Sequence, residues 1–168
     1  MKIESLQDLF ETELRLAYDC EQKLVKKGLP NMMEASTSPE LRQAFQEHLQ
    51  QTRQHVTRLD QAFAAIGKNP DTQDNDVFDE MSKGAEKKAK AIESPSLRDA
   101  ALIACANQVE HYEIAVYGSL VAFAQQLGLN NAATSLQQTL QEEKEADAKL
   151  TQLAETSINS RATQLRAA

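Results

Sequence analysis

The chain has 168 residues, which is enough for one domain with a hydrophobic core and too few to suggest two. Hydrophobic residues make up 41% of it, which excludes a disordered chain, and a net charge of −7 without a basic cluster argues against a nucleic-acid partner. No apolar run approaches the roughly 20 residues that span a bilayer. Because the N-terminal residues also lack an apolar stretch of signal-peptide length, we expect a cytoplasmic protein that does not contact a membrane.

The composition favours helices. With 5 glycines and 4 prolines, the chain has few of the turn-forming residues that a many-stranded sheet needs. It is rich in alanine, leucine, glutamine, glutamate and lysine, which favour helices. Cys20 and Cys105 stand apart rather than in a CxxC pair. We interpret them as small core residues of a reduced protein.

The first two helices are predicted from capping residues and amphipathic periodicity. Ser5 and Asp8 resemble a capping box, and an apolar stripe then continues to about Met33. Ser38 suits an N-cap that is followed by a proline at the first helical position. The second helix runs from there to about Ile66.

Three further helices follow in the second half of the chain. Ser94 suits the N-cap of the fourth helix, Gly128 ends that helix, and Asn130 or Asn131 is expected to cap the fifth. The expected ranges are 76–92 for a shorter helix, about 97–127, and about 130–159. We expect a single helical domain over residues 1–160 and a frayed tail over residues 161–168.

This order of elements predicts an all-α fold. Four long helices with a long connection between the second and the third are typical of the ferritin-like four-helix bundle. The short helix over 76–92 lies within that connection as one extra helix.

Polar residues interrupt the apolar seams of the last two long helices. On a helical wheel, Glu143 and Asp147 fall in the middle of the seam of the last helix, between leucines. Glu110 and Glu113 interrupt the seam of the preceding long helix in the same way. Such positions are hard to explain as a solvated face.

The first two helices show the same feature less sharply. His48, Thr52 and His55 break the apolar seam of the second helix at its middle. In the first helix, Glu13 falls near the centre of the inward face and Glu21 at its edge, so the wheel leaves the choice between them open.

A bound metal pair would explain this arrangement. Buried carboxylates without partners cost several kcal/mol each, and about two divalent ions would offset four to five of them. Carboxylate and imidazole ligands suit iron or manganese, and zinc is an alternative. Taken singly, each histidine fits a hydrogen-bonded core residue, Glu13 fits a solvated or salt-bridged position, and Glu142 and Glu145 fit a solvated acidic face. The three tyrosines fit packing positions, although Tyr117 also suits a hydrogen bond to a ligand.

The same segments resemble the YciE/YciF family of ferritin-like bacterial stress proteins, and YciF-like members most closely. The resemblance covers nearly the whole chain and is closest at 18–24 (YDCEQKL), 98–103 (RDAALI), 109–115 (VEHYEIA), 117–120 (YGSL) and 140–143 (LQEE). It implies four long helices with a short fifth, a homodimer and a di-iron-type centre. Because Glu21 lies in the matching motif and Glu13 does not, the resemblance favours Glu21 as the ligand from the first helix.

Two positions depart from the family pattern. Gln51 stands where members commonly carry glutamate, and a glutamine is a neutral and weaker metal ligand. His55, one turn further on the same face, would compensate as an imidazole ligand. The last helix offers Asp147 one turn after Glu143 in place of the usual histidine.

The leading hypothesis is therefore a stress-response protein with two divalent metal ions, most simply iron, that oxidises Fe(II) or consumes peroxide. The expected metal ligands are Glu21, His48, His55, Glu110, Glu113, Glu143 and Asp147. The alternative is a metal-free helical stress protein that acts through dimerisation or partner binding, whose polar core is a hydrogen-bond network.

Overall fold

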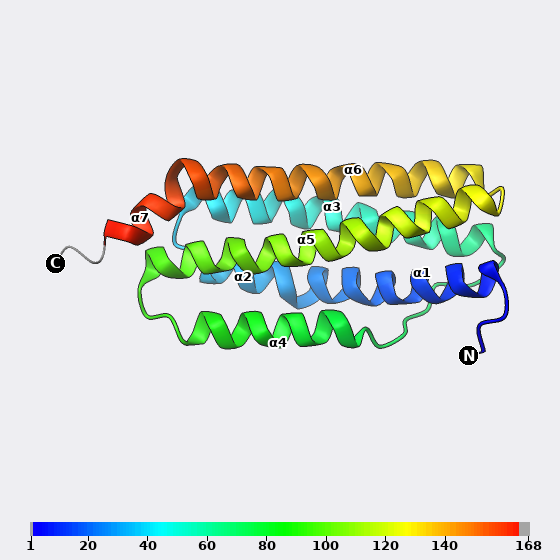
Figure 1. Cartoon of the computed structure of the whole chain (residues 1–168), viewed down its shortest axis with the longest axis horizontal. Helices are drawn as coiled ribbons and strands as arrows, with labels where there is room; N and C mark the ends of the chain where they lie inside the picture. The colour runs from blue at the N-terminus through cyan, green and yellow to red at the C-terminus, as the bar shows by residue number, and fades with distance from the viewer. Residues whose placement is uncertain (1, 165–168) are drawn as a thin grey trace.

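The computed structural model describes residues 2–164 and is built of helices that lie nearly parallel or antiparallel to one another (Figure 1). Over these residues no β-strand forms. The helices are α1 (Leu6–Lys23), α2 (Leu29–Ala35), α3 (Pro39–Ala65), α4 (Asp76–Lys90), α5 (Pro95–Gln126), α6 (Asn130–Leu153) and α7 (Asn159–Thr163). Short π-helical turns join α1 to α2 over Leu24–Gly28 and α6 to α7 over Ala154–Ile158.

The topology confirms the predicted all-α, ferritin-like four-helix bundle. The four long rods are α1 with α2, α3, α5, and α6 with its continuation, and the connection from α3 to α5 carries α4 as the extra short helix (Figure 1). Ion pairs fasten α4 to the first rod, Lys23 with Asp79 at 2.5 Å and Lys27 with Glu86 at 2.7 Å.

Serine caps start three of the long helices as predicted. The Oγ atoms of Ser5, Ser38 and Ser94 accept hydrogen bonds from backbone N–H groups three residues later, at 3.1, 3.3 and 3.4 Å. The start of α6 differs from the prediction, because Leu129 rather than an asparagine occupies the N-cap and no side chain caps it. Gly128 has a φ of +72°, and the N–H of Leu129 donates to the carbonyl of Ala124 at 2.9 Å, so the chain passes directly from the end of α5 into α6.

The end of the chain is more helical than predicted. Ile158 is buried, and α7 continues to Thr163, so residues 161–163 are helical rather than frayed. Arg161 supports this turn by donating to the Oγ of Ser157 at 3.1 Å. Gln164 is the C-cap of α7, and the last residues of the predicted frayed tail, 165–168, lie outside the described residues.

Two apolar clusters form the core, one toward each end of the bundle. The first includes Phe10, Leu14, Leu59, Phe63, Leu120 and Leu136, and the second includes Leu24, Leu41, Phe45, Leu102, Ile103 and Leu150. In α5 and α6 the polar seam residues Glu110, Glu113 and Glu143 lie between the two clusters, whereas Glu21 and His48 lie beside residues of the second cluster.

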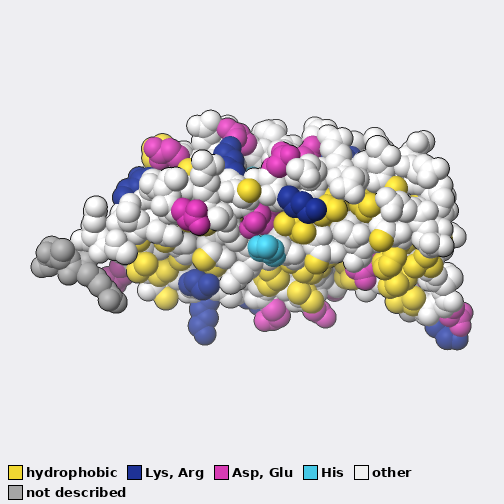
Figure 2. All heavy atoms as spheres, turned by 45° about the horizontal axis from the view of Figure 1, so that its top comes forward, with side chains coloured by type: hydrophobic (Ala, Val, Ile, Leu, Met, Phe, Trp, Pro, Cys, Tyr) yellow, Lys and Arg dark blue, Asp and Glu magenta, His cyan; other side chains and the backbone are white. Residues whose placement is uncertain are grey.

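Charged groups are scattered over the surface. Figure 2 shows acidic and basic side chains lying singly on the visible face, with hydrophobic side chains gathered along its lower part. None of the helices in the described part of the chain combines the length and the apolar character that crossing a bilayer requires.

Candidate metal centre

Six buried polar side chains from all four long rods meet at the middle of the bundle. In each of two groups, one potential ligand atom per residue lies within 4.8 Å of the others. One group is His48, Glu110, Glu113 and Glu143, and the other is Glu21, His55 and Glu143. Glu143 belongs to both, so the two groups form one continuous cluster.

The first group is built on α3, α5 and α6. The Nε2 atom of His48 lies 3.4 Å from Oε1 of Glu110 and 3.7 Å from Oε2 of Glu143. Glu113 follows Glu110 by three residues on α5, so both carboxylates project from the same face of that helix. The thiol of Cys20 donates to Oε1 of Glu113 at 3.6 Å.

The second group adds α1. The Nδ1 atom of His55 lies 2.9 Å from Oε1 of Glu143 and 3.3 Å from Oε1 of Glu21, in directions that complete no hydrogen bond. The hydroxyl of Tyr117 donates to Oε1 of Glu21 and fixes that carboxylate. Tyr117 therefore supports the cluster, while Tyr18 packs edge-on against Phe63 at a centroid distance of 5.8 Å.

Each of these carboxylates has at least one oxygen without a hydrogen-bond partner despite its deep burial. Glu21, Glu110, Glu113 and Glu143 are each at most 3% exposed. One oxygen of each of the first three, and both oxygens of Glu143, accept no hydrogen bond. Buried polar atoms are rarely left unpaired, so this concentration calls for bound protons, water or cations among the carboxylates.

The pKa shifts of the clustered residues indicate that the buried acids need positive charge among them. Burial raises the pKa of Glu110 and of Glu113 well above the usual range, and the nearby Glu143 adds to both shifts. Burial alone would lower the pKa of His55, but Glu21 and Glu143 raise it to about 11. Burial would likewise raise the pKa of Glu143, but His55 and His48 lower it. Positive charge is therefore required among these acids, either as bound protons or as metal ions.

The donor set fits a pair of divalent ions. Four carboxylates and two imidazoles provide the oxygen and nitrogen ligands that iron, manganese and zinc accept. Two ions of charge 2+ would balance four carboxylates, and the unpaired oxygens are the atoms that such ions would engage.

An outer ion pair, which the sequence did not predict, holds His55 in place. Oε2 of Glu142 lies 2.9 Å from Nε2 of His55, and Arg58 grips both oxygens of Glu142 at 2.7 and 3.0 Å. Arg58 lowers the pKa of Glu142 to about 2 against the opposing effect of its burial. In the sequence, Glu142 directly precedes Glu143, and Arg58 follows His55 by three residues. Both Glu142 and Arg58 fit a solvated face equally well, so the sequence gives no other sign of this ion pair.

Two candidate acids lie apart from the cluster. Asp147 is not among the grouped residues, and its Oδ1 lies 3.5 Å from Nε2 of the exposed His111. Four residues advance a helix by about 400°, so Asp147 is turned about 40° away from Glu143, toward the α5–α6 boundary. Glu13 is partly exposed and also lies outside both groups, whereas Glu21 is inside.

A bundle with a long central crossover, lined at mid-length by carboxylates and imidazoles from all four rods, defines a ferritin-like helical protein with a candidate dinuclear metal centre. Comparison with known proteins gives the particular family. The chain belongs to the family described as "Domain of unknown function (DUF892)", whose model matches residues 5–163.

The relatives confirm the predicted resemblance. The chain is 37% identical over 163 residues to protein YciF of Escherichia coli (strain K12), covering 96% of this chain and 98% of that protein. The crystal structure of the E. coli stress protein YciF matches with a TM-score of 0.88 and 36% identity, covering 94% of this chain and 99% of that chain. YcfI from Rhodopseudomonas palustris, described as a proposed structural protein, matches with a TM-score of 0.87 and 39% identity over 89% and 95% of the two chains. A Xanthomonas campestris protein at 18% identity and a TM-score of 0.74 shows the same fold.

Proposed function

We propose that this protein holds two divalent metal ions at the middle of its bundle, most simply iron, with manganese or zinc as alternatives. The ligands are Glu21, His48, His55, Glu110, Glu113 and Glu143. One observation carries the proposal: five carboxylate oxygens of four buried glutamates, drawn from three rods, have no hydrogen-bond partner and converge on two imidazoles.

In this proposal the residues of the centre bind the metal ions, their neighbours orient the ligand carboxylates, and the apolar clusters shield the site from bulk water. Glu143 faces His48 with Oε2 and His55 with Oε1, so it is the residue through which the two halves are joined. Tyr117 and Cys20 donate to the carboxylates of Glu21 and Glu113 and restrict their orientation. The apolar clusters on either side keep bulk water away along the bundle axis.

The proposed activity belongs to the stress response, for which the relative YciF is named. Bound iron or manganese would supply one-electron redox chemistry toward oxygen or peroxide. With Fe(II) as substrate and hydrogen peroxide as oxidant, two Fe(II) each lose one electron. The peroxide takes up those two electrons and two solvent protons and forms two water molecules. We further propose that the protein works as a homodimer in the cytoplasm, which light scattering and cell fractionation test.

Metal content tests the proposal directly. Purified protein reconstituted with iron or manganese should carry close to two ions per chain by elemental analysis. Glu113→Ala and Glu143→Ala should abolish this binding, because each removes an unpaired buried carboxylate. Glu155→Ala is a matched control, since Glu155 is exposed on the turn after α6. Less than one ion per wild-type chain would refute a dinuclear centre.

A second candidate function follows from His55. With its pKa raised to about 11, this imidazole would be protonated at neutral pH and would itself offset the charge of Glu21 or Glu143. The cluster would then be a structural polar core, and the protein would act through dimerisation or partner binding. Thermal melts with and without a chelator separate the two candidates, because only a metal that binds the folded state raises the melting temperature.

A further inference from the structure

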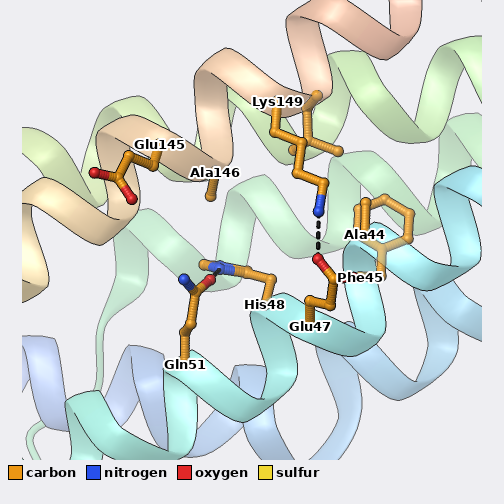
Figure 3. Close-up of a pocket in the computed structure, with 9 residues that line it drawn as sticks. Ala44, Phe45, Glu47, His48, Gln51, Glu145, Ala146 and Lys149 are labelled. Atoms are coloured by element: carbon orange, nitrogen blue, oxygen red, sulfur yellow. Dashed lines mark hydrogen bonds and ion pairs between the residues drawn. The ribbon is translucent and has the colours of Figure 1, made fainter.

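A pocket of about 220 Å³ lies between α3 and α6. Figure 3 shows His48, Gln51 and Glu47 rising from α3, and Lys149, Glu145 and Ala146 facing them from α6. The volume is below the roughly 300 Å³ at the lower end for organic ligands, so the pocket suits an ion or a molecule of a few atoms.

The pocket ends on the metal centre. Of the six clustered residues, His48 is the one that lines it, and His48 is also the most exposed of the six at 6%. Its Nε2 faces the carboxylates of Glu110 and Glu143, while Nδ1 makes a long contact of 3.5 Å with Oε1 of Gln51. The imidazole of His48 therefore separates the pocket from the carboxylates of the centre, and its Nδ1 is held only by the long contact with Gln51.

The other imidazole is closed off. His55 is fully buried, and its outer nitrogen is occupied by Glu142, which Arg58 clamps in turn. Arg58 also donates to the hydroxyl of Thr139 at 3.1 Å, so this side is sealed by a network that joins α3 to α6.

The charges at the pocket suit a cation. Two acids, Glu47 and Glu145, face one base, Lys149, which pairs with Glu47 across the gap between the helices (Figure 3). The lining is therefore net negative and attracts positive ions. The ion pair is half exposed, and its desolvation is slight, so it can open at little cost.

We propose that divalent cations enter the centre through this pocket, past the imidazole of His48, and not from the side of His55. This inference rests on the proposed metal-binding function. The proposed entrance is lined by Glu47, Gln51, Glu145 and Lys149, none of which is a proposed metal ligand.

Uptake of cobalt(II) by the metal-free protein tests this route, with the visible absorption of the bound ion as the signal in stopped flow. Ala146→Leu fills the pocket and should slow uptake about tenfold, because the ion must then wait for the helices to part. Ala148→Leu is the matched control, since Ala148 is exposed on the same helix, and its uptake rate should equal that of the wild type. Lys149→Ala opens the entrance and removes the positive charge, so uptake should be several-fold faster at low salt.

The outcomes separate the two proposals. A wild type that binds no cobalt overturns both the centre and the entrance. A wild type that binds cobalt, together with equal rates in Ala146→Leu and Ala148→Leu, overturns the entrance and leaves the centre standing. If Ala146→Leu does not fold, Lys149→Ala decides alone, and an unchanged or slower rate in that variant overturns the entrance.

Discussion

Replacement of Glu113 by glutamine should make the metal-free protein more stable and the metal-loaded protein less so. The carboxylate is 2% exposed, its Oε2 has no partner, and its Oε1 accepts only from the thiol of Cys20 at 3.6 Å. Burial therefore raises its pKa well above the usual 4.5. Without metal, burial therefore favours the protonated form of this side chain.

The size of the effect follows from that proton. Keeping a carboxyl group of ordinary pKa 4.5 protonated at pH 7 costs at most about 3 kcal/mol, since each pKa unit corresponds to about 1.4 kcal/mol. Glutamine has nearly the same shape and needs no proton, but its buried amide meets the same shortage of partners, which costs about 1 to 2 kcal/mol. The expected net gain of about 1 to 2 kcal/mol would raise the melting temperature by about 2 to 8 °C.

Thermal melts of wild type and Glu113→Gln, each in chelator and with excess metal, measure this. With metal at about 100 times its dissociation constant, the wild type should gain about 3 kcal/mol, and the variant should lose most of that gain. Glu155→Gln, an exposed substitution with the same change in charge, should follow the wild type in both conditions. A Glu113→Gln variant that melts below the wild type in chelator, or that keeps the full metal-dependent gain, would refute the reasoning.

Three further predictions concern the surroundings of the centre. Glu142→Gln should weaken metal binding about 10- to 100-fold by titration calorimetry, because it removes the carboxylate that orients His55; unchanged affinity would contradict this role. Gln51→Glu should tighten binding, since it places a carboxylate beside Nδ1 of His48, and weaker binding in the same titration would contradict the placement. In chelator, denaturant melts should show stability falling as the pH rises above about 4.5, because the raised pKa values of Glu110 and Glu113, and of His55 at about 11, make the folded state bind more protons than the unfolded state. Protonation of Glu142, whose pKa is lowered to about 2, destabilises the folded state only below about pH 4.5. A metal-free protein that becomes more stable as the pH rises above about 4.5 would therefore contradict the raised pKa values of the buried cluster.

The fold could be predicted largely from sequence because the helices are amphipathic and their starts are marked by serine caps. The same periodicity placed Glu110, Glu113 and Glu143 in the seams, since a polar residue between two apolar turns stands out from its neighbours. The π-helical turn at Leu24–Gly28 left no such mark. It changes the backbone hydrogen bonds without changing the apolar pattern of the rod.

Single positions are harder to place from sequence where one turn of helix decides the environment. Asp147 shares the four-residue spacing of the seam, but the accumulated rotation carries it to the α5–α6 boundary beside His111. The sequence pattern places Glu142 on a solvated face because its neighbour Glu143 faces inward. Its burial depends on Arg58, a residue 84 positions away in sequence, and a single-helix pattern contains no information about such a partner.

The division of the core explains how the bundle tolerates its centre. Apolar packing is concentrated in two clusters on either side of the polar segment, so the fold draws its hydrophobic stabilisation from regions that a metal does not touch. In small metal-dependent domains the ion supplies the folding energy itself, and chelators unfold them. Here a chelator should lower the melting temperature and leave the helical circular dichroism at 25 °C unchanged. Loss of helix on metal removal would mean that the two clusters cannot hold the bundle without the ions between them.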